Sequence, residues 1–299
     1  MLTPPSLQKG DKIAIVCPAK KITGNIEPAI KLLESWGLTV ILGKTVFSSY
    51  YQFAGDDEQR TKDFQDFLND PSIKAIIAAR GGYGSVRIID KLSFDLFLQH
   101  PKWIVGFSDI TVFHAHIERN FQLSTIHGQM PLTMADSQPL GLETLRKALF
   151  GESLTYQFPI HPLNRNGNCV GKVIGGNLSI LVNLLGSVSD MDYTDKILFI
   201  EDVGEQLYAL DRLLWTLKRA NKLTSLKGLV VGSFTALKDD DKEPFGKSVE
   251  EIIFEKVEEY NYPVYFNFPA GHQTNNQSII LGKELSLNSE NEQIIAYYN

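Results

Sequence analysis

The chain has 299 residues, of which 43% are hydrophobic and 21% charged, with a formal net charge of −6. This length allows one or two domains with a substantial core, and the composition is that of an ordinary globular protein. A negative net charge without a basic cluster argues against nucleic acid or an anionic membrane as a partner.

Location is indicated by the apolar runs and the cysteines. None of the apolar runs approaches the roughly 20 residues that span a bilayer, and residues 1–11 lack the apolar segment of a signal peptide. The two cysteines, Cys17 and Cys169, are far apart in the chain, so a disulfide framework is not expected. We therefore expect a cytoplasmic protein.

The first half of the chain alternates short apolar strands with helices. We expect strands at 12–17, 38–42, 75–79, 103–107 and 124–127, and helices at 26–36, 56–68, 86–92 and directly after Ser108. This alternation predicts a parallel sheet with helices on both faces. The carboxyl ends of parallel strands share one edge, so Cys17, Ser108 and His127 are expected to gather there.

From about residue 150 to 170, glycine, proline and asparagine interrupt this pattern. Beyond it we expect strands at 171–174, 197–200 and 229–234 and helices at 178–185, 207–220 and 249–260. The prediction is an α/β protein with a parallel-sheet N-terminal domain over residues 1–150 that carries a nucleophile elbow. A linker at 151–170 then leads to a smaller mixed α/β C-terminal domain at 171–299.

The most informative stretch is Gly106-Phe107-Ser108-Asp109-Ile110-Thr111. An apolar strand precedes it, and residues that favour a helix start follow. This strand, sharp turn and helix, with a serine at the turn, is the arrangement of a nucleophile elbow, although Ile110 stands where glycine is usual. The alternative reading of Ser108 is a plain helix N-cap.

A glycine loop, Arg80-Gly81-Gly82-Tyr83-Gly84, follows the third expected strand. Its backbone N–H groups could face a ligand anion or an oxyanion. A dinucleotide site is a weaker reading, because the spacing is not G-x-G-x-x-G. A tight strand-to-helix turn without a ligand explains the same residues.

Histidines and acids complete the set of reactive candidates. The six histidines are His100, His114, His116, His127, His161 and His272. His114 and His116 cannot share a helix face, so they do not suggest a zinc pair, whereas His127 and His272 each adjoin a glycine at a strand end. Glu201 ends an apolar strand and could orient an imidazole, with Asp202 and Glu205 as rivals.

Taken together, these stretches resemble the LD-carboxypeptidase family of serine peptidases, which includes microcin-immunity hydrolases. The resemblance covers nearly the whole chain. It rests on motifs whose order and spacing are specific: 7–16 with Pro18-Ala19, 80–84, 106–111, His127-Gly128, 175–178, Glu201-Asp202, Asp211-Arg212 and Gly271-His272. Gln129, and the 278–282 stretch that lacks a proline, depart from the family pattern but touch no catalytic position.

The resemblance implies roles for individual residues. Ser108 is then the nucleophile, Glu201 the triad acid and His272 the base. The oxyanion donors fall on the backbone N–H groups of Gly82 and Asp109. Arg80, Gly81 and Tyr83 are candidate substrate contacts. The family uses no metal or organic cofactor.

The implied reaction is removal of the terminal D-alanine from a murein tetrapeptide in cell-wall peptide recycling. The family also implies two domains, a cleft between them and a homodimer. Two other functions stay open: hydrolysis of a peptide-nucleotide antibiotic for self-immunity, and non-catalytic peptide binding. A nucleotide site would favour an aromatic stacking residue in 151–170, where Tyr156 and Phe158 are present but tryptophan is not.

Overall fold

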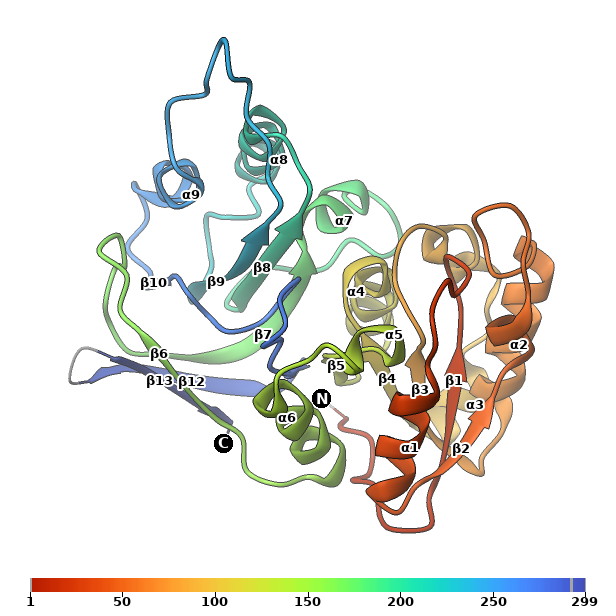
Figure 1. Ribbon diagram of the computed structural model, residues 1–299. Helices are drawn as coiled ribbons and strands as arrows, with labels where there is room; N and C mark the ends of the chain where they lie inside the picture. The colour runs from red at the N-terminus through yellow and green to blue at the C-terminus, as the bar shows by residue number, and fades with distance from the viewer. Residues whose placement is uncertain (1, 291–292, 299) are drawn as a thin grey trace.

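Two lobes lie side by side in the computed structural model, which describes residues 2–290 and 293–298 (Figure 1). The first half of the chain, coloured red to yellow, builds one lobe, and most of the later residues build the other. The helices α4 and α5 lie where the lobes meet. The domain limits expected at residues 1 and 299 lie outside the described residues.

Within the described residues, the N-terminal lobe is built on a six-stranded sheet in the order β11-β5-β4-β3-β1-β2. Strands β1 to β5 run parallel, as the alternation of strands and helices predicted. The strands are β1 Lys12–Val16, β2 Thr39–Leu42, β3 Ile73–Ala78, β4 Trp103–Gly106, β5 Thr125–His127 and β11 Ile279–Leu281. Since β3 and β4 are parallel neighbours, the loops that follow them meet at the same edge.

Helices cover this sheet and connect its strands. They are α1 Glu27–Ser35, α2 Asp57–Asn69, α3 Asp95–Gln99, α4 Thr111–Phe121, α5 Pro131–Met134 and α6 Pro139–Phe150, with the 3₁₀ turns η1 Lys44–Phe47, η2 Ser85–Arg87, η3 Ile89–Lys91 and η4 Ser108–Ile110. The start of α2 is fixed by a capping box in which Asp56 accepts the Gln59 N–H at 2.8 Å. The single helix expected at 86–92 is instead two 3₁₀ turns, since so short a segment is a poor α-helix.

The second sheet has seven strands within the described residues, in the order β10-β9-β8-β7-β12-β13-β6. Four of them are parallel and three antiparallel, so the second lobe is mixed as predicted. The strands are β6 Thr155–Pro159, β7 Cys169–Asn177, β8 Ile197–Val203, β9 Gly228–Thr235, β10 Val264–Tyr265, β12 Glu284–Glu290 and β13 Gln293–Tyr298.

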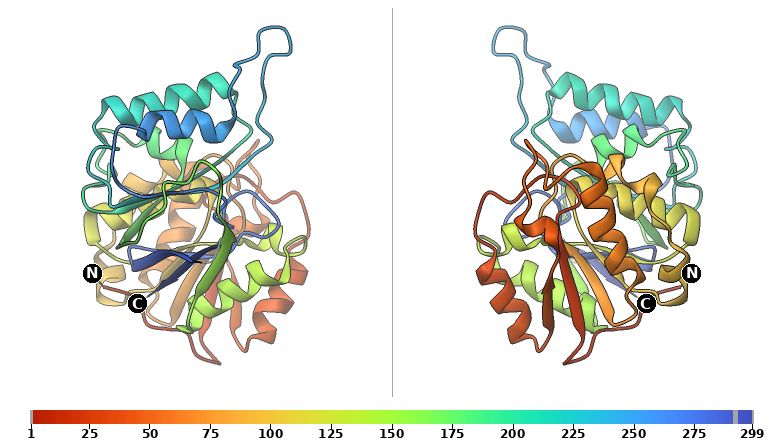
Figure 2. Two further views of the ribbon diagram at one scale, coloured as in Figure 1. Left: turned by 90° about the vertical axis from the view of Figure 1, so that its left-hand side faces the viewer. Right: turned by 90° about the vertical axis from the view of Figure 1, so that its right-hand side faces the viewer.

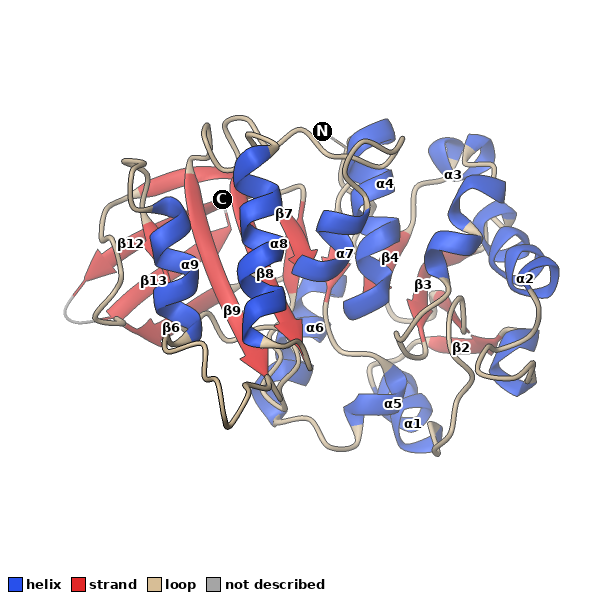
Figure 3. Cartoon of the chain, turned by 90° about the horizontal axis from the view of Figure 1, so that it is seen from above, coloured by secondary structure: helices blue, strands red, loops and turns tan. Residues whose placement is uncertain are grey.

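The helices of this lobe are α7 Leu178–Asn183, α8 Leu207–Arg219 and α9 Val249–Val257. The views in Figure 2 and Figure 3 show α8 and α9 side by side on one face of the parallel strands. The buried face of α8 comes from apolar residues at helical spacing, including Leu210, Leu214 and Leu217.

Two segments depart from the expected division into domains. The linker predicted at 151–170 contains β6, because alternate side chains there, Tyr156 and Phe158, are buried in the second lobe. The 171–299 segment also sends β11 back to the first sheet, where its buried residues pair with β5. The chain therefore crosses between the lobes more often than one linker would allow.

The two lobes are joined directly behind the nucleophile elbow. The Thr111 hydroxyl, at the start of α4, accepts the backbone N–H of Asn177 at 3.0 Å. A Cβ on Gly176 would lie 2.5 Å from Thr111 Oγ1, so only glycine allows this approach. The end of β7 therefore fixes the elbow helix against the second lobe.

In the part of the chain that the structure describes, no helix is both long and apolar enough to cross a membrane.

Candidate active site

The chain reverses sharply after β4, and Ser108 stands at the turn. Its φ is +63°, in the left-handed region that non-glycine residues seldom adopt. A Cβ on Gly106 would lie 2.8 Å from the Ile110 side chain, so this glycine makes room for the isoleucine two residues after the serine. The half-buried Ser108 thus has the strained backbone of a nucleophile elbow.

The glycine loop packs directly on this serine. A Cβ on Gly81 would lie 2.9 Å from Ser108 Cβ and 3.1 Å from Ser108 Oγ. Gly82 has a φ of +118°, and the stem of Lys20 covers it. Asp109 follows the serine in η4, at a helix start where N–H groups lack intrahelical acceptors. The two expected oxyanion donors are therefore close to Ser108, since Gly82 follows Gly81, which packs on the serine, and Asp109 follows the serine itself.

The side chain of Asp109 points into the protein and binds the backbone of a neighbouring segment. It is buried, and its Oδ2 accepts the backbone N–H of Ser85 at 2.8 Å. Burial raises the pKa of the Asp109 carboxyl, although the Ser85 hydrogen bond opposes this shift. Asp109 thereby ties the elbow to the segment that follows the glycine loop.

Glu201 and His272 form a hydrogen-bonded pair in the second lobe. Glu201 lies in β8 with its side chain fully buried, and its Oε2 is 2.6 Å from His272 Nδ1. Burial raises the pKa of the Glu201 carboxyl, but the interactions with His127 and His272 outweigh burial and hold the pKa at about 2. With Glu201 ionised, Nδ1 carries the proton and Nε2 of His272 is the basic nitrogen.

The backbone around His272 is held by residues without reactive chemistry. Its carbonyl accepts the Thr235 hydroxyl at 3.0 Å, and the N–H of Gly271 donates to Asn276 Oδ1 at 2.8 Å. A Cβ on Gly271, where φ is +112°, would lie 2.8 Å from Glu201 Cβ. Glycine is therefore required for the histidine loop to approach the carboxylate so closely.

Phe107 brings the two halves of the site together. Its ring packs edge-on against the His272 imidazole, with centroids 4.9 Å apart, and the next residue along the chain is Ser108. Among the described residues, the hydrogen bonds of the site do not include one between the Ser108 hydroxyl and His272. Such bonds often tighten only when substrate is bound.

The other histidines occupy different positions. His127 is fully buried, and its Nε2 lies 3.9 Å from Glu201 Oε1, beyond hydrogen-bond distance. His114 is bonded through Nε2 to the Gly106 carbonyl at 2.9 Å, and burial lowers its pKa to about 3. His116 contacts Ser189 Oγ at 2.9 Å, across the two lobes. Only His272 is hydrogen-bonded to Glu201 among the residues described.

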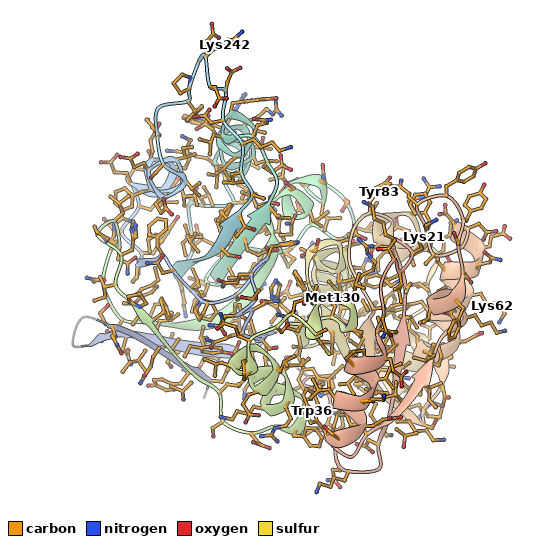
Figure 4. All side chains as sticks on the ribbon, in the orientation of Figure 1. Lys21, Trp36, Lys62, Tyr83, Met130 and Lys242 are labelled. Carbon is orange, nitrogen blue, oxygen red and sulfur yellow. The ribbon has the colours of Figure 1, made fainter. Side chains whose placement is uncertain are left out.

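The candidate substrate contacts Arg80 and Tyr83 flank Gly81 and Gly82 in the glycine loop. Arg80 donates through Nη1 to the Lys21 carbonyl at 3.2 Å. Tyr83 is 45% exposed, and its ring centroid lies 6.0 Å from that of Phe53. Figure 4 shows Lys21 and Tyr83 on the same side of the N-terminal lobe. One nitrogen of the Arg80 guanidinium is therefore bound to the backbone of the Lys21 segment.

A cavity opens beside the catalytic candidates. It has a volume of about 300 Å³ and is lined by Phe107 and His272 together with Gln129, Thr133 and Asp136. The lining combines an aromatic ring, an amide, a hydroxyl and a carboxylate. Among the described residues, no group of three or more His, Cys, Asp or Glu side chains could hold a metal ion.

Comparison with known proteins identifies the family. Residues 13–128 match the family model of the LD-carboxypeptidase N-terminal domain, and residues 170–287 match that of the C-terminal domain. The chain belongs to the LD-carboxypeptidase family. This family is one of peptidases, and the resemblance drawn from the sequence motifs is confirmed.

Two curated carboxypeptidases match this chain over most of their length. A probable murein peptide carboxypeptidase of Bacillus subtilis is 32% identical over 96% of this chain and 91% of its own. A murein tetrapeptide carboxypeptidase of Pseudomonas aeruginosa is 31% identical over 91% of each. The crystal structure of the muramoyltetrapeptide carboxypeptidase from Oxalobacter formigenes has a TM-score of 0.86 and 26% identity, covering 96% of this chain and 98% of that one.

The microcin C7 self-immunity protein MccF shares the fold. Its complex with aspartyl sulfamoyl adenosine has a TM-score of 0.89 and 21% identity, covering 100% of this chain and 99% of that one. Together with the Oxalobacter structure it confirms the predicted two-lobed α/β fold.

Sequence reasoning missed the residues that hold the site in place. Thr235 and Asn276 fix the backbone around His272, and Thr111 fixes the elbow against Asn177. These are uncharged side chains in ordinary contexts, so periodicity does not single them out. The glycines at 176 and 271 were the available signal, because each allows a close approach between lobes or loops.

Proposed function

We propose that this protein is a serine LD-carboxypeptidase that removes the terminal D-alanine from murein tetrapeptides. The observation that carries the proposal is the pairing of a strained serine with a buried acid and imidazole. Ser108 has a φ of +63°. Glu201 is hydrogen-bonded to His272 at 2.6 Å, and the His272 ring packs against Phe107, the residue before the serine. Neither a helix N-cap nor a peptide-binding module needs all of these features.

In the proposed mechanism His272 acts first as a base. Its Nε2 takes the proton of the Ser108 hydroxyl while Oγ forms a bond to the scissile carbonyl carbon. The imidazolium that results is stabilised by the ionised Glu201, which also fixes the tautomer. His272 then gives the proton to the nitrogen of the departing D-alanine, the C–N bond breaks, and an acyl-enzyme remains on Ser108.

Water completes the cycle through the same groups. His272 takes a proton from water as its oxygen attacks the acyl carbon, and the Ser108 oxygen leaves with that proton. In each half-reaction the negative oxygen is proposed to lie against the N–H groups of Gly82 and Asp109. Each such donor is worth about 3 kcal/mol in the transition state.

The proposed substrate must present a free terminal carboxylate. Burying that group without a cation or several N–H donors would be very costly. Arg80, Gly81 and Tyr83, on the loop that packs against Ser108, are the proposed contacts for this end of the substrate. The cavity beside His272 is proposed to take an adjoining part of the peptide.

The second candidate is self-immunity hydrolysis of a peptide-nucleotide antibiotic. The similarity of the fold to that of MccF supports it. The structure of the 151–170 segment weakens it. Tyr156 and Phe158 are 1% and 4% exposed, so neither ring can stack on a nucleobase. We therefore rank peptide hydrolysis first.

The deciding experiment offers a panel of murein tetrapeptides, with lysine or diaminopimelate at the third position, and reads the products by mass spectrometry. We expect loss of one D-alanine, no effect of EDTA, and no product from Ser108→Ala. Aspartyl sulfamoyl adenosine serves as the competing substrate. Turnover of the nucleotide compound alone would replace the proposal with the second candidate, and loss of activity with EDTA that zinc restores would refute a serine mechanism.

We further propose that the protein acts in the cytoplasm as a homodimer, in the recycling of cell-wall peptides. Light scattering after gel filtration tests the dimer. A monomer at micromolar concentration would contradict that part of the proposal and leave the reaction untouched.

A further inference from the structure

A second imidazole lies against the triad acid. His127 ends β5 and pairs in register with Gly106 of β4, the strand that leads into the elbow. Its side chain is fully buried between the rings of Phe107 and Phe199, whose centroids lie 5.8 and 5.1 Å from that of the imidazole. A histidine is a costly residue to bury there unless its ring nitrogens have partners.

Neither ring nitrogen of His127 has a hydrogen-bond partner among the described residues, and neither does Glu201 Oε1. These orphaned atoms face each other, since His127 Nε2 lies 3.9 Å from Oε1. The other carboxylate oxygen, Oε2, is held by His272. The gap exceeds the usual N–H···O distance by about 1 Å, so an inward movement of this size by either side chain would satisfy both groups.

The surroundings leave few other roles for this imidazole. The titratable groups that face it are Glu201 from β8 and His114 from α4, with His272 beyond the carboxylate. His114 binds the Gly106 carbonyl through Nε2, so this nitrogen is not available to Glu201. His127 is therefore the side chain placed to complete the acceptor shell of Glu201.

We propose that His127 is a positioning residue that donates Nε2–H to Glu201 Oε1. This inference rests on the proposed function, in which Glu201 orients His272. A carboxylate held at one oxygen can rotate about its last bond, whereas one held at both oxygens keeps Oε2 aligned with the histidine. The second donor also draws charge from the carboxylate, and so moderates its pull on the His272 imidazolium.

The test compares two substitutions at one site. His127→Gln keeps an N–H donor of similar reach, whereas His127→Leu removes it and leaves Oε1 buried without a partner. We expect kcat of His127→Leu to fall about tenfold, the loss that follows from an unsatisfied buried acceptor. The acid limb of its kcat/KM profile should move to higher pH, because the carboxylate then holds the imidazolium more strongly. His127→Gln should keep kcat within about threefold and leave the acid limb in place.

His114→Gln is the matched control, since His114 is as deeply buried but bonded to a backbone carbonyl. It should lower the melting temperature without moving the acid limb. Equal losses in His127→Gln and His127→Leu, with both acid limbs unmoved, would overturn the proposal and leave His127 a packing residue.

A second measurement does not depend on activity. Nitrogen-15 NMR of histidine-labelled Ser108→Ala protein reads which nitrogen of His127 carries the proton. A proton on Nε2 is expected, and a proton on Nδ1 alone would overturn the proposal even if the variants unfold. Because this readout involves no turnover, it also separates failure of the His127 role from failure of the proposed reaction.

Discussion

Two strand ends face each other across the lobes, and each carries a proposed catalytic residue followed by a buried aspartate. The first is Ser108-Asp109 after β4, and the second is Glu201-Asp202 at the end of β8. Both aspartates bind the first turn of a nearby helical segment: Asp109 accepts the Ser85 N–H of η2, and Asp202 accepts the Ser179 N–H of α7 at 2.9 Å. Burial raises the pKa of both aspartyl groups.

The two ends differ in how they hold the proposed catalytic residue. At β4 the backbone is strained and Ser108 is half-buried, so its hydroxyl is open to the site. At β8 the backbone stays in the strand and Glu201 is fully buried, with its charge held by imidazoles. A nucleophile must be presented to substrate, whereas a carboxylate that only orients a base is best kept from water. Substitutions at either strand end test one side of this contrast.

The largest effect is expected at the strained end. Ser108→Ala should lower kcat on the order of 10⁶-fold, because no other described hydroxyl takes the place of the nucleophile. Activity within tenfold of the wild type would remove Ser108 from the mechanism. The fold should persist, as judged by circular dichroism, since the side chain lies at a turn.

A glycine at the same position isolates the strain. Ser108→Gly should be more stable than Ser108→Ala by about 1 kcal/mol in urea unfolding, because only glycine adopts a positive φ without cost. Equal stability of the two variants would mean that the turn carries no strain at this residue.

The next largest effect is expected at the buried end. Glu201→Gln keeps the size of the side chain but removes the charge that stabilises the imidazolium and fixes its tautomer. By analogy with other triads, kcat should fall about 10⁴-fold, with a smaller change in KM. Asp202→Asn, the neighbouring carboxylate bonded to Asn177 and Ser179, is the control and should keep kcat within about tenfold. Comparable kcat losses in both variants would assign Glu201 no special role.

The sequence predicted both strand ends but not how they meet. Apolar runs placed β4 and β8, and turn-forming residues placed the elbow at Ser108. The assignment of the base to His272 needed the family motifs, because His127 and His272 each adjoin a glycine at a strand end and local pattern does not choose between them. What remained hidden was contact between distant segments, such as Thr111 with Asn177 or His127 with Glu201.

The strand inside the expected linker and the return of β11 to the first sheet were missed for the same reason. Residues 151–170 were expected to be a linker because glycine, proline and asparagine recur in them. The structure instead has strand β6 there, with Tyr156 and Phe158 on its buried face. The β11 strand lies far from β5 in sequence, and its three apolar residues carry no sign of which sheet they join. Pairing over such separations depends on tertiary packing, which a local pattern does not record.

Acid titration sharpens the contrast between the adjacent carboxylates Glu201 and Asp202. The folded pKa of Glu201 is lowered from 4.5 to about 2, so its contribution to stability is present above pH 4.5 and lost as pH falls toward 2. The pKa of Asp202 is raised from 3.8 by burial, so its contribution is present below 3.8 and lost as pH rises through the folded pKa.

Urea unfolding at a series of pH values checks these signs. The stability that Glu201→Gln loses relative to the wild type should shrink as the pH is lowered from about 5 toward 3. For Asp202→Asn the loss should instead grow over the same range. Matching slopes for the two variants would contradict the opposite environments described for these neighbours.

The smallest effect is expected where the strained end meets the substrate. If Arg80 receives the terminal carboxylate, a tetrapeptide amidated at its C-terminus should lose about tenfold in kcat/KM, the worth of one charge-assisted contact. Arg80→Ala should then cleave the free acid and the amide almost equally. Because Arg80 also braces the Lys21 carbonyl, this variant should lower kcat for both substrates as well.

Lys21→Ala removes a charge from the same surface but keeps that carbonyl, so it should preserve the discrimination. Parallel losses on acid and amide in Arg80→Ala would make Arg80 a brace only, and would leave the reading of the carboxylate to backbone N–H groups of the glycine loop.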